Sequence, residues 1–208
     1  MGSFKSIESR EASESPCFVA GTPVHTATGV VPIQDLKIGD LVLSAMDGSD
    51  APEYRRIAKV DSLNDQEVTL IRVGGLLESR EETFEFDLVV TDTHRFWVKE
   101  LGWLEAFRLE EGSQLLRTDG GDAWVSIAEV VVETGEPHIG WTTRDSDTQG
   151  PTIDLRDDQI SVTRDFDEYT FNPEALRNWV RMKRTVHRIE VEGRHSFFAG
   201  DVGVLVEG

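Results

Sequence analysis

The sequence predicts a mostly β fold built from two copies of one structural unit, and three observations support this. Short apolar segments alternate with turn residues through most of the 208 residues, which is typical of sheets of short strands. Apolar residues make up 38% of the chain, enough for a sizeable core. One segment recurs at a fixed offset of 73 residues, which indicates the same supersecondary unit built twice.

The elements follow in order along the chain. Residues 1–16 are polar and poor in apolar side chains, so we expect a flexible leader there. Helical periodicity over three turns occurs only at residues 173–184, where Asn172 can cap the helix and Pro173 suits its first position. The predicted strands are 22–26, 30–33, 41–45, 56–60, 67–73, 83–91, 95–99, 114–117, 123–132, 186–191 and 196–199.

The repeat places residues 29–43 over residues 102–116 without a gap. Each copy keeps two glycines, a leucine between them and an apolar ending, and the same shift aligns Gly21 with His94 and Val24 with Trp97. Two such units usually pack about an approximate two-fold axis. We therefore expect the segment starts, at Cys17 and at 91–94, to meet at the centre of the molecule.

Composition excludes several classes of function. With 39 acidic and 21 basic residues the net charge is −18, which disfavours binding to nucleic acid or to an anionic membrane surface. No apolar run approaches the roughly 18 residues of a membrane-spanning helix. The single cysteine excludes an internal disulfide and a multi-cysteine zinc site. We expect no cofactor and no metal, since the aspartates of the acidic segment lack a calcium-loop spacing.

Cys17 is the single cysteine of the sequence, and its thiol is a candidate nucleophile. A neighbouring group that promotes the thiolate activates cysteine, and a nearby histidine can move protons near neutral pH. On residue types alone, a lone cysteine is more often an inert buried small hydrophobic residue.

Four motifs resemble those of Hint (Hedgehog/intein) domains, especially the bacterial intein-like and polymorphic-toxin precursor kinds. Residues 17–26 (CFVAGTPVHT) with 33–43 (IQDLKIGDLVL) resemble the N-terminal motif, and 90–94 (VTDTH) resembles the second motif with its Thr-x-x-His. Residues 186–200 (VHRIEVEGRHSFFAG) and 203–206 (GVLV) resemble the C-terminal motifs.

The resemblance implies a horseshoe-like β fold with two pseudo-symmetric halves and a reaction that the chain performs on itself. The Cys17 sulfur would attack the carbonyl carbon of Pro16 and convert the Pro16–Cys17 peptide bond to a thioester. The resemblance gives His94 the role of supplying a proton to the departing amine, Thr91 that of holding the geometry, and His195 that of assisting a later C-terminal step. His25 and His187 are expected to be structural.

Departures from the family pattern limit what is expected. The sequence reads Val206-Glu207-Gly208 where splicing members have a histidine–asparagine pair, so complete splicing is not expected. Arg188 stands where many relatives carry an acidic or amide residue, and Pro16 crowds the attacked carbonyl and fixes its own φ, which favours a slow first step.

The domain organisation predicted from the motifs has four parts. They are a leader (1–16), the main part of the Hint domain (17–132), an insertion (133–185) and the C-terminal strands (186–208). The insertion, too short for a homing endonuclease, is expected to be a solvated subdomain or an acidic docking surface for a protein partner.

Three functions remain open at this stage. The first is autoproteolysis at Pro16–Cys17, with the chain's own flanking polypeptide, such as a toxin or effector domain, as the partner. The second is an inactive Hint fold that serves as a scaffold or binding module of such a precursor. The third is a cysteine hydrolase that acts on other molecules. The resemblance implies synthesis in the cytoplasm and export as part of an effector or toxin precursor.

Overall fold

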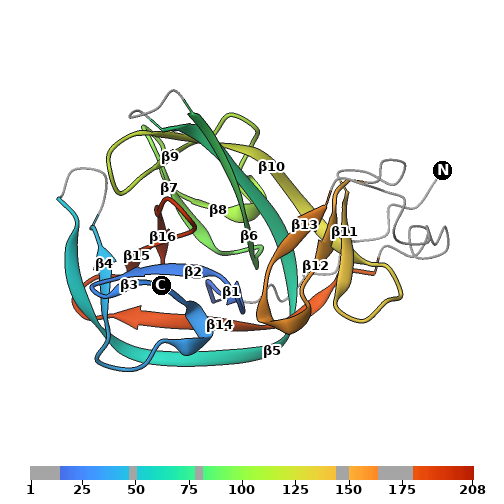
Figure 1. Cartoon of the computed structure of the whole chain (residues 1–208), viewed down its shortest axis with the longest axis horizontal. Coiled ribbons are helices and arrows are strands. Elements are labelled where there is room, and N and C mark those ends of the chain that lie inside the picture. The colour runs from blue at the N-terminus through green and yellow to red at the C-terminus, as the bar shows by residue number, and fades with distance from the viewer. Residues whose placement is uncertain (1–14, 47–50, 78–81, 144–149, 164–179) are drawn as a thin grey trace, which may run out of the picture.

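The computed structural model describes residues 15–46, 51–77, 82–143, 150–163 and 180–208. Within these ranges the chain forms 16 strands and three short 3-10 helices, so the predicted mostly β class is confirmed (Figure 1). The strands are β1 (Phe18–Val19), β2 (Pro23–Thr26), β3 (Gly29–Pro32), β4 (Leu41–Ser44), β5 (Glu53–Leu77), β6 (Glu82–Thr91), β7 (Arg95–Val98), β8 (Gly102–Glu105), β9 (Gln114–Leu116), β10 (Asp122–Glu133), β11 (Ile139–Thr143), β12 (Thr152–Asp154), β13 (Ser161–Thr163), β14 (Lys183–Val191), β15 (Ser196–Ala199) and β16 (Val204–Glu207). The 3-10 helices are η1 (Ile33–Asp35), η2 (Ala106–Arg108) and η3 (Arg156–Asp158).

The long strand β5 connects the parts of the sheet. It spans 25 residues and pairs with β4, β6, β10 and β14. Residues 68–75 of β5 are all buried, because neighbouring parts of the fold cover both faces of the sheet there. Sequence analysis predicted two separate strands, 56–60 and 67–73, and this division is wrong. Asn64-Asp65 forms a bulge against β14, with Asp65 at φ 56°, instead of a turn that ends the strand.

The predicted internal repeat is confirmed element by element. The units β2–β3–η1–β4 and β7–β8–η2–β9 follow the same path. In each unit a glycine in the left-handed region donates its N–H to a strand carbonyl: Gly39 (φ +95°) to Ile57 at 2.9 Å, and Gly112 (φ +88°) to Val125 at 2.8 Å. Only glycine adopts that backbone readily, which explains why both copies keep it.

The predicted alignment of β2 with β7, the strands that precede residues 29–43 and 102–116, is corrected by one residue. The hairpin β2–β3 has a loop of two residues, whereas β7–β8 has a loop of three. The offset is therefore 72 before the loop and 73 after it. Thr22 and His94 are equivalent, because their carbonyls accept bonds from Ile33 and Ala106 at 2.9 and 2.7 Å. Val24 accordingly corresponds to Phe96, and the predicted pairs Gly21–His94 and Val24–Trp97 are wrong.

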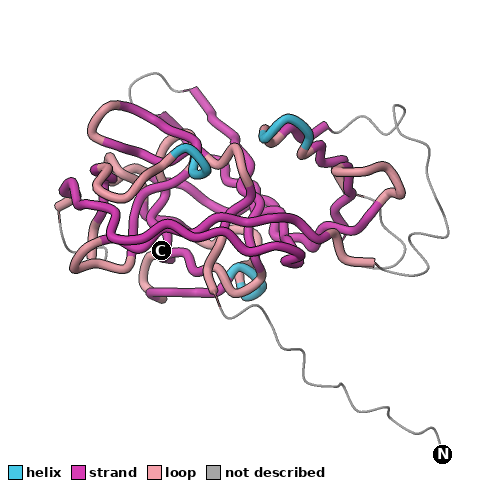
Figure 2. The backbone as a smooth tube through the Cα atoms, turned by 90° about the horizontal axis from the view of Figure 1, so that it is seen from below, coloured by secondary structure: helices cyan, strands magenta, loops and turns pink. Residues whose placement is uncertain are grey.

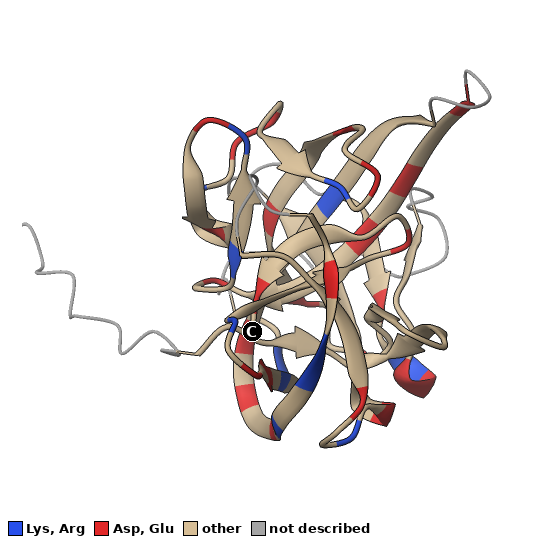
Figure 3. Cartoon of the chain, turned by 90° about the vertical axis from the view of Figure 1, so that its left-hand side faces the viewer, with Lys and Arg blue, Asp and Glu red and all other residues tan. Residues whose placement is uncertain are grey.

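The segment from 133 to 185 adds three strands next to β10. The strands β11, β12 and β13 extend the sheet in antiparallel order and lie to one side of the body in both views (Figures 1 and 2). Buried side chains of this segment, Ile153, Leu155 and Met182, pack in one cluster with Cys17 and Val186. The segment is therefore joined to the core, and acidic positions lie on many strands and loops of the whole chain (Figure 3).

The predicted helix 173–184 does not reach its expected end. Residues 173–179 lie outside the described part of the chain. Arg181 forms an isolated bridge with Val132, and β14 begins at Lys183. The extended form is favoured because Met182 is 3% exposed and its backbone bonds to Val131 and Val68 at 2.9 and 3.2 Å. These sheet contacts outweigh the helical periodicity of the sequence.

Candidate functional site around Cys17

The hydroxyl of Thr91 lies at the Pro16–Cys17 bond. Thr91 ends β6, beside β1, and its N–H donates to the carbonyl of Cys17 at 3.1 Å. Its Oγ1 accepts the N–H of Cys17 at 3.2 Å and donates to the carbonyl of Ser15 at 3.2 Å. One side chain therefore holds the backbone on both sides of Pro16. The predicted meeting of Cys17 with the 91–94 segment is seen directly in these bonds.

The thiol of Cys17 is fully buried, with 0% exposure. Burial raises the pKa of Cys17 to about 11, with Arg188 lowering it and Asp61 raising it. These two charged groups form an ion pair at 2.8 Å, and Arg188 Nη1 also donates to Ser15 Oγ at 3.1 Å. A thiol with this pKa is almost entirely protonated near neutral pH, so a nucleophilic attack needs a nearby acceptor for the proton.

His94 lies in the turn that follows Thr91, where its N–H donates to the Thr91 carbonyl at 3.0 Å. Its ring packs edge-on against Phe18 and Phe96, with centroid distances of 4.1 and 5.3 Å. The ring is fully buried and neither nitrogen has a hydrogen-bond partner among the described residues. Burial lowers the pKa of His94 to about 3, so the imidazole is neutral at pH 7. A buried polar group without a partner is unfavourable for stability, which is a common feature of functional sites.

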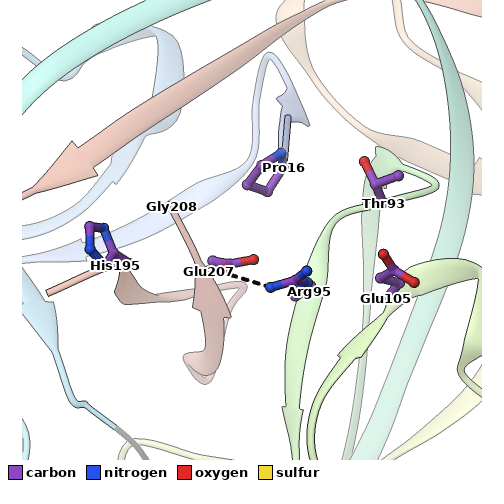
Figure 4. A pocket seen from close by; sticks show the side chains of 7 residues that line it. All are labelled: Pro16, Thr93, Arg95, Glu105, His195, Glu207 and Gly208. Carbon is purple, nitrogen blue, oxygen red and sulfur yellow. Dashed lines mark hydrogen bonds and ion pairs between the residues drawn. The ribbon is translucent and has the colours of Figure 1, made fainter. Parts of the chain in front are cut away.

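A cavity of about 440 Å³ reaches the junction at Pro16, which forms part of its lining. Figure 4 shows Pro16, His195 and Gly208 around it, together with Arg95 and Glu207, which form an ion pair at 3.4 Å. Thr93 and Glu105 complete the lining. The structure thus places His195 on the cavity that Pro16 also lines, outside the buried cluster of Cys17. Residues 16 and 208 line one cavity although they lie at opposite ends of the described part of the chain.

The other histidines occupy different places. His25 Nε2 contacts the carbonyl of Gly200 at 2.9 Å, which fits the structural role expected of it. His187 is on β14, opposite Phe18 on β1, and burial lowers its pKa. His138 touches Arg184 within the inserted segment.

Sequence reasoning missed three residues at the site. Arg188 and Asp61 act electrostatically on the pKa of Cys17, and Asp92 in the turn binds Arg181. The motif contains Asp92, but its partner lies 89 residues away in the chain, so no local pattern indicates the contact. In the described ranges no group of three His, Cys, Asp or Glu residues could hold a metal ion. Among the aspartates of the acidic segment, Asp145 and Asp147 lie outside those ranges, and Asp154 forms an ion pair with Arg156.

Solved structures of inteins share this fold. A bacterial intein-like domain from Clostridium thermocellum is 20% identical, with a TM-score of 0.56 over 92% of this chain and 98% of that one. A DnaB intein from Synechocystis sp. is 16% identical, with a TM-score of 0.52 over 93% and 99% of the two chains. The gp41-1 intein is 16% identical, with a TM-score of 0.51 over 93% of this chain and 99% of that one. The fold is thus that of the intein-like class.

The sequence adds the family to the fold. Residues 16–117 match the family model described as the Hint domain, and none of the curated proteins matches the sequence. Residues 16–117 therefore match a Hint domain in sequence, and the chain has a fold of the intein-like class. Fold and family together support a self-processing domain as the general class of function. Among the described residues no helix is long and apolar enough to cross a membrane.

Proposed function

We propose that this domain cleaves its own chain at the Pro16–Cys17 bond through an N–S acyl shift. The observation that carries the proposal is the position of Thr91 Oγ1, which bonds to the N–H of Cys17 and to the carbonyl of Ser15 at 3.2 Å each. These bonds hold the junction at the one cysteine of the chain. A fixed geometry favours an intramolecular attack, because the reacting groups need not be brought together in the transition state.

The proposed step balances without any cofactor. The Cys17 sulfur bonds to the Pro16 carbonyl carbon, and the bond from that carbon to the Cys17 nitrogen breaks. The thiol proton leaves the sulfur, and the departing nitrogen gains a proton. A neutral imidazole can accept the thiol proton and donate a proton to the departing nitrogen. His94, in the turn after Thr91, is neutral at pH 7 because its pKa is lowered. Thr91 orients the nitrogen in this scheme.

The thioester would then be opened from the cavity beside Pro16. The proline is partly exposed there and lines the cavity with His195 and Gly208, so a small nucleophile such as water or an added thiol has access to the acyl carbon. We assign His195 to this second stage, and not to the first.

We further propose that asparagine cyclisation does not take place at residues 207–208. Glu207 and Gly208 carry no side-chain amide, so asparagine cyclisation has no donor at these positions. A Cβ atom at 208 would lie 2.7 Å from both the Ile189 carbonyl and the Phe197 ring. Asparagine at position 208 would therefore require its neighbours to move. The flanking polypeptide, in a toxin or effector precursor, is the proposed substrate.

The intact mass of the purified chain over time, with and without dithiothreitol, tests this function. Self-cleavage converts the chain to residues 1–16 and 17–208, and the thiol accelerates the conversion by attacking the thioester. An inactive scaffold keeps its full mass under both conditions. A cysteine hydrolase keeps its leader and instead consumes an added thioester or peptide substrate.

The rate of cleavage is expected to change little with pH near neutrality. The reactive form carries a thiol at Cys17 and a neutral His94. Because the pKa values are about 11 and about 3, this form predominates over most of the range between them. We expect the rate at saturating dithiothreitol to vary by less than about threefold from roughly pH 6 to 9. A rise of about tenfold per pH unit would mean that solvent removes the thiol proton, and would contradict the role of His94.

Removal of the Thr91 hydroxyl is expected to slow cleavage about 10- to 100-fold, because both of its hydrogen bonds at the junction are lost. Thr91→Val keeps the shape of this fully buried side chain, and Thr91→Ser keeps the hydroxyl and serves as the matched control. Rates follow from the loss of intact mass. Equal rates for the valine and serine variants would remove Thr91 from the mechanism.

Pro16→Ala is expected to cleave faster than the parent chain. The pyrrolidine ring limits how the Pro16 carbonyl turns toward the sulfur, whereas alanine leaves that rotation free. The melting temperature should stay unchanged, since Pro16 lines an open cavity and is not part of the apolar clusters. A parent that cleaves completely during expression would show that proline is no barrier.

A further inference from the structure

Arg181 reaches from the end of the inserted segment into the candidate site. Its side chain is 8% exposed. Nη2 donates to Asp92 Oδ1 at 2.7 Å and Nη1 to Asp92 Oδ2 at 3.1 Å, so the two groups meet in a bidentate pair. Nη2 also donates to the Val68 carbonyl at 3.0 Å and to Thr69 Oγ1 at 3.2 Å. The guanidinium therefore links the insertion, β5 and the turn after β6.

Asp92 is the residue between Thr91 and Thr93 in that turn. Its carboxylate accepts a further bond from Thr69 Oγ1 at 2.6 Å, and its backbone carbonyl accepts the N–H of Phe107 at 3.1 Å. The turn is closed by the His94 N–H on the Thr91 carbonyl at 3.0 Å. A residue with this many contacts fixes the backbone on which the Thr91 hydroxyl and the His94 ring depend.

We propose that Arg181 is a positioning residue for self-cleavage, acting through Asp92 on the turn that carries Thr91 and His94. This inference rests on the proposed function and makes the insertion part of the processing site. The sequence-based alternative, a solvated docking surface, leaves the guanidinium without a reason to be buried. Arg is suited to this task because its rigid planar fork fixes direction as well as charge.

A second contact of the insertion supports the same interpretation. Ile153, Leu155 and Met182 form part of the apolar cluster that buries Cys17. A Cβ at Gly21, four residues after the nucleophile, would lie 2.5 Å from the Asp158 carbonyl, so η3 packs against the N-terminal motif. The insertion thus contacts both halves of the candidate pair, the cysteine and the Thr-x-x-His turn.

The test measures the cleavage rate of the full chain with dithiothreitol, by intact mass, for variants of this network. We expect Arg181→Met to cleave about 10- to 100-fold more slowly, because the turn loses its bidentate anchor. Arg181→Lys, which keeps the charge but not the fork, should fall between this variant and the parent. Arg156→Met breaks another Arg–Asp pair of the insertion, an exposed one with Asp154, and should cleave at the parent rate.

A double variant separates positioning from general support of the fold. If Arg181 acts through the turn, then Arg181→Met added to Thr91→Val should slow cleavage by no more than about twofold beyond the slower single variant. Independent effects would instead multiply, and this result would overturn the proposal. Where Arg181→Met does not fold, Thr69→Val removes the 2.6 Å bond to Asp92 and the 3.2 Å bond from Arg181, but leaves the bidentate Arg181–Asp92 pair in place. This variant should slow cleavage while the melting temperature changes little.

The outcomes also separate this inference from the proposed function. If the parent chain cleaves and Arg181→Met cleaves equally fast, the inference alone is wrong. If the parent chain does not cleave under any condition, the proposed function is wrong and the inference falls with it.

Discussion

Cys17→Ala is expected to leave residues 1–16 attached under all conditions, with a rate at least about 10³-fold below that of the parent chain, because a proposed covalent step loses its nucleophile. Alanine fits the site, since Cys17 is fully buried among apolar side chains, and folding should be retained. The measurement is the intact mass over days with dithiothreitol.

The matched control is Cys17→Ser, which retains an atom able to attack. It should cleave slowly, and hydroxylamine should accelerate it by opening the ester. If Cys17→Ala cleaved like the parent, the bond would be broken by another route and the acyl shift would be wrong.

His94→Leu is expected to slow cleavage by roughly 10²- to 10⁴-fold, the range of a well-placed proton transfer. Leucine is chosen because the ring lies between Phe18 and Phe96 and its nitrogens have no partner among the described residues. An apolar side chain of similar size avoids the cavity that alanine would leave. Stability near pH 7 should therefore be retained or increased, by about 1–3 kcal/mol at most.

The residual cleavage of His94→Leu should depend on pH, whereas the cleavage of the parent chain should change little with pH. Without the imidazole the thiol proton must leave to solvent, so the rate should rise about tenfold per pH unit below the pKa of about 11 for Cys17. A variant that cleaves at the parent rate would remove His94 from the mechanism.

The same substitution should alter stability in acid. The pKa of His94 falls from the ordinary 6.5 to about 3 on folding, so between these values the unfolded chain binds a proton that the folded chain does not. The stability that the neutral ring supplies is present above pH 6.5 and is lost as the pH falls toward 3. Melting temperatures from pH 7 to 4 should drop more steeply for the parent than for His94→Leu.

Much of the fold was predictable from local patterns in the sequence. The repeated units carry their own turn glycines, and Gly39 and Gly112 need their positive φ wherever the unit stands. The one-residue error in aligning Val24 arose because a loop residue was added to the second hairpin, which a gapless comparison cannot detect. The strands predicted at 56–60 and 67–73 are one strand, because Asn64-Asp65 between them forms a bulge against β14.

The sequence predicted the residues of the candidate site that belong to the motifs, but not the charged residues around them. Cys17 and Thr91 meet as the repeat symmetry indicates, with the bond from Cys17 N to Thr91 Oγ1 at 3.2 Å. Arg181 and Asp61 were not predicted, because each depends on a contact over a long sequence separation between charged residues that are common in this chain. The burial of Arg181 is set by the packing of the insertion, which no periodicity encodes.

The shared cavity of Pro16 and Gly208 has a consequence for how this domain connects to other polypeptides. A fold whose entry and exit points lie side by side can be placed within a surface loop of a host protein without forcing the two host segments apart. Under the proposed cleavage at Pro16–Cys17, such a host would stay joined to the domain only through a polypeptide that continues beyond residue 208. The released segment could still stay bound through its noncovalent contacts with the host, as a nicked protein does.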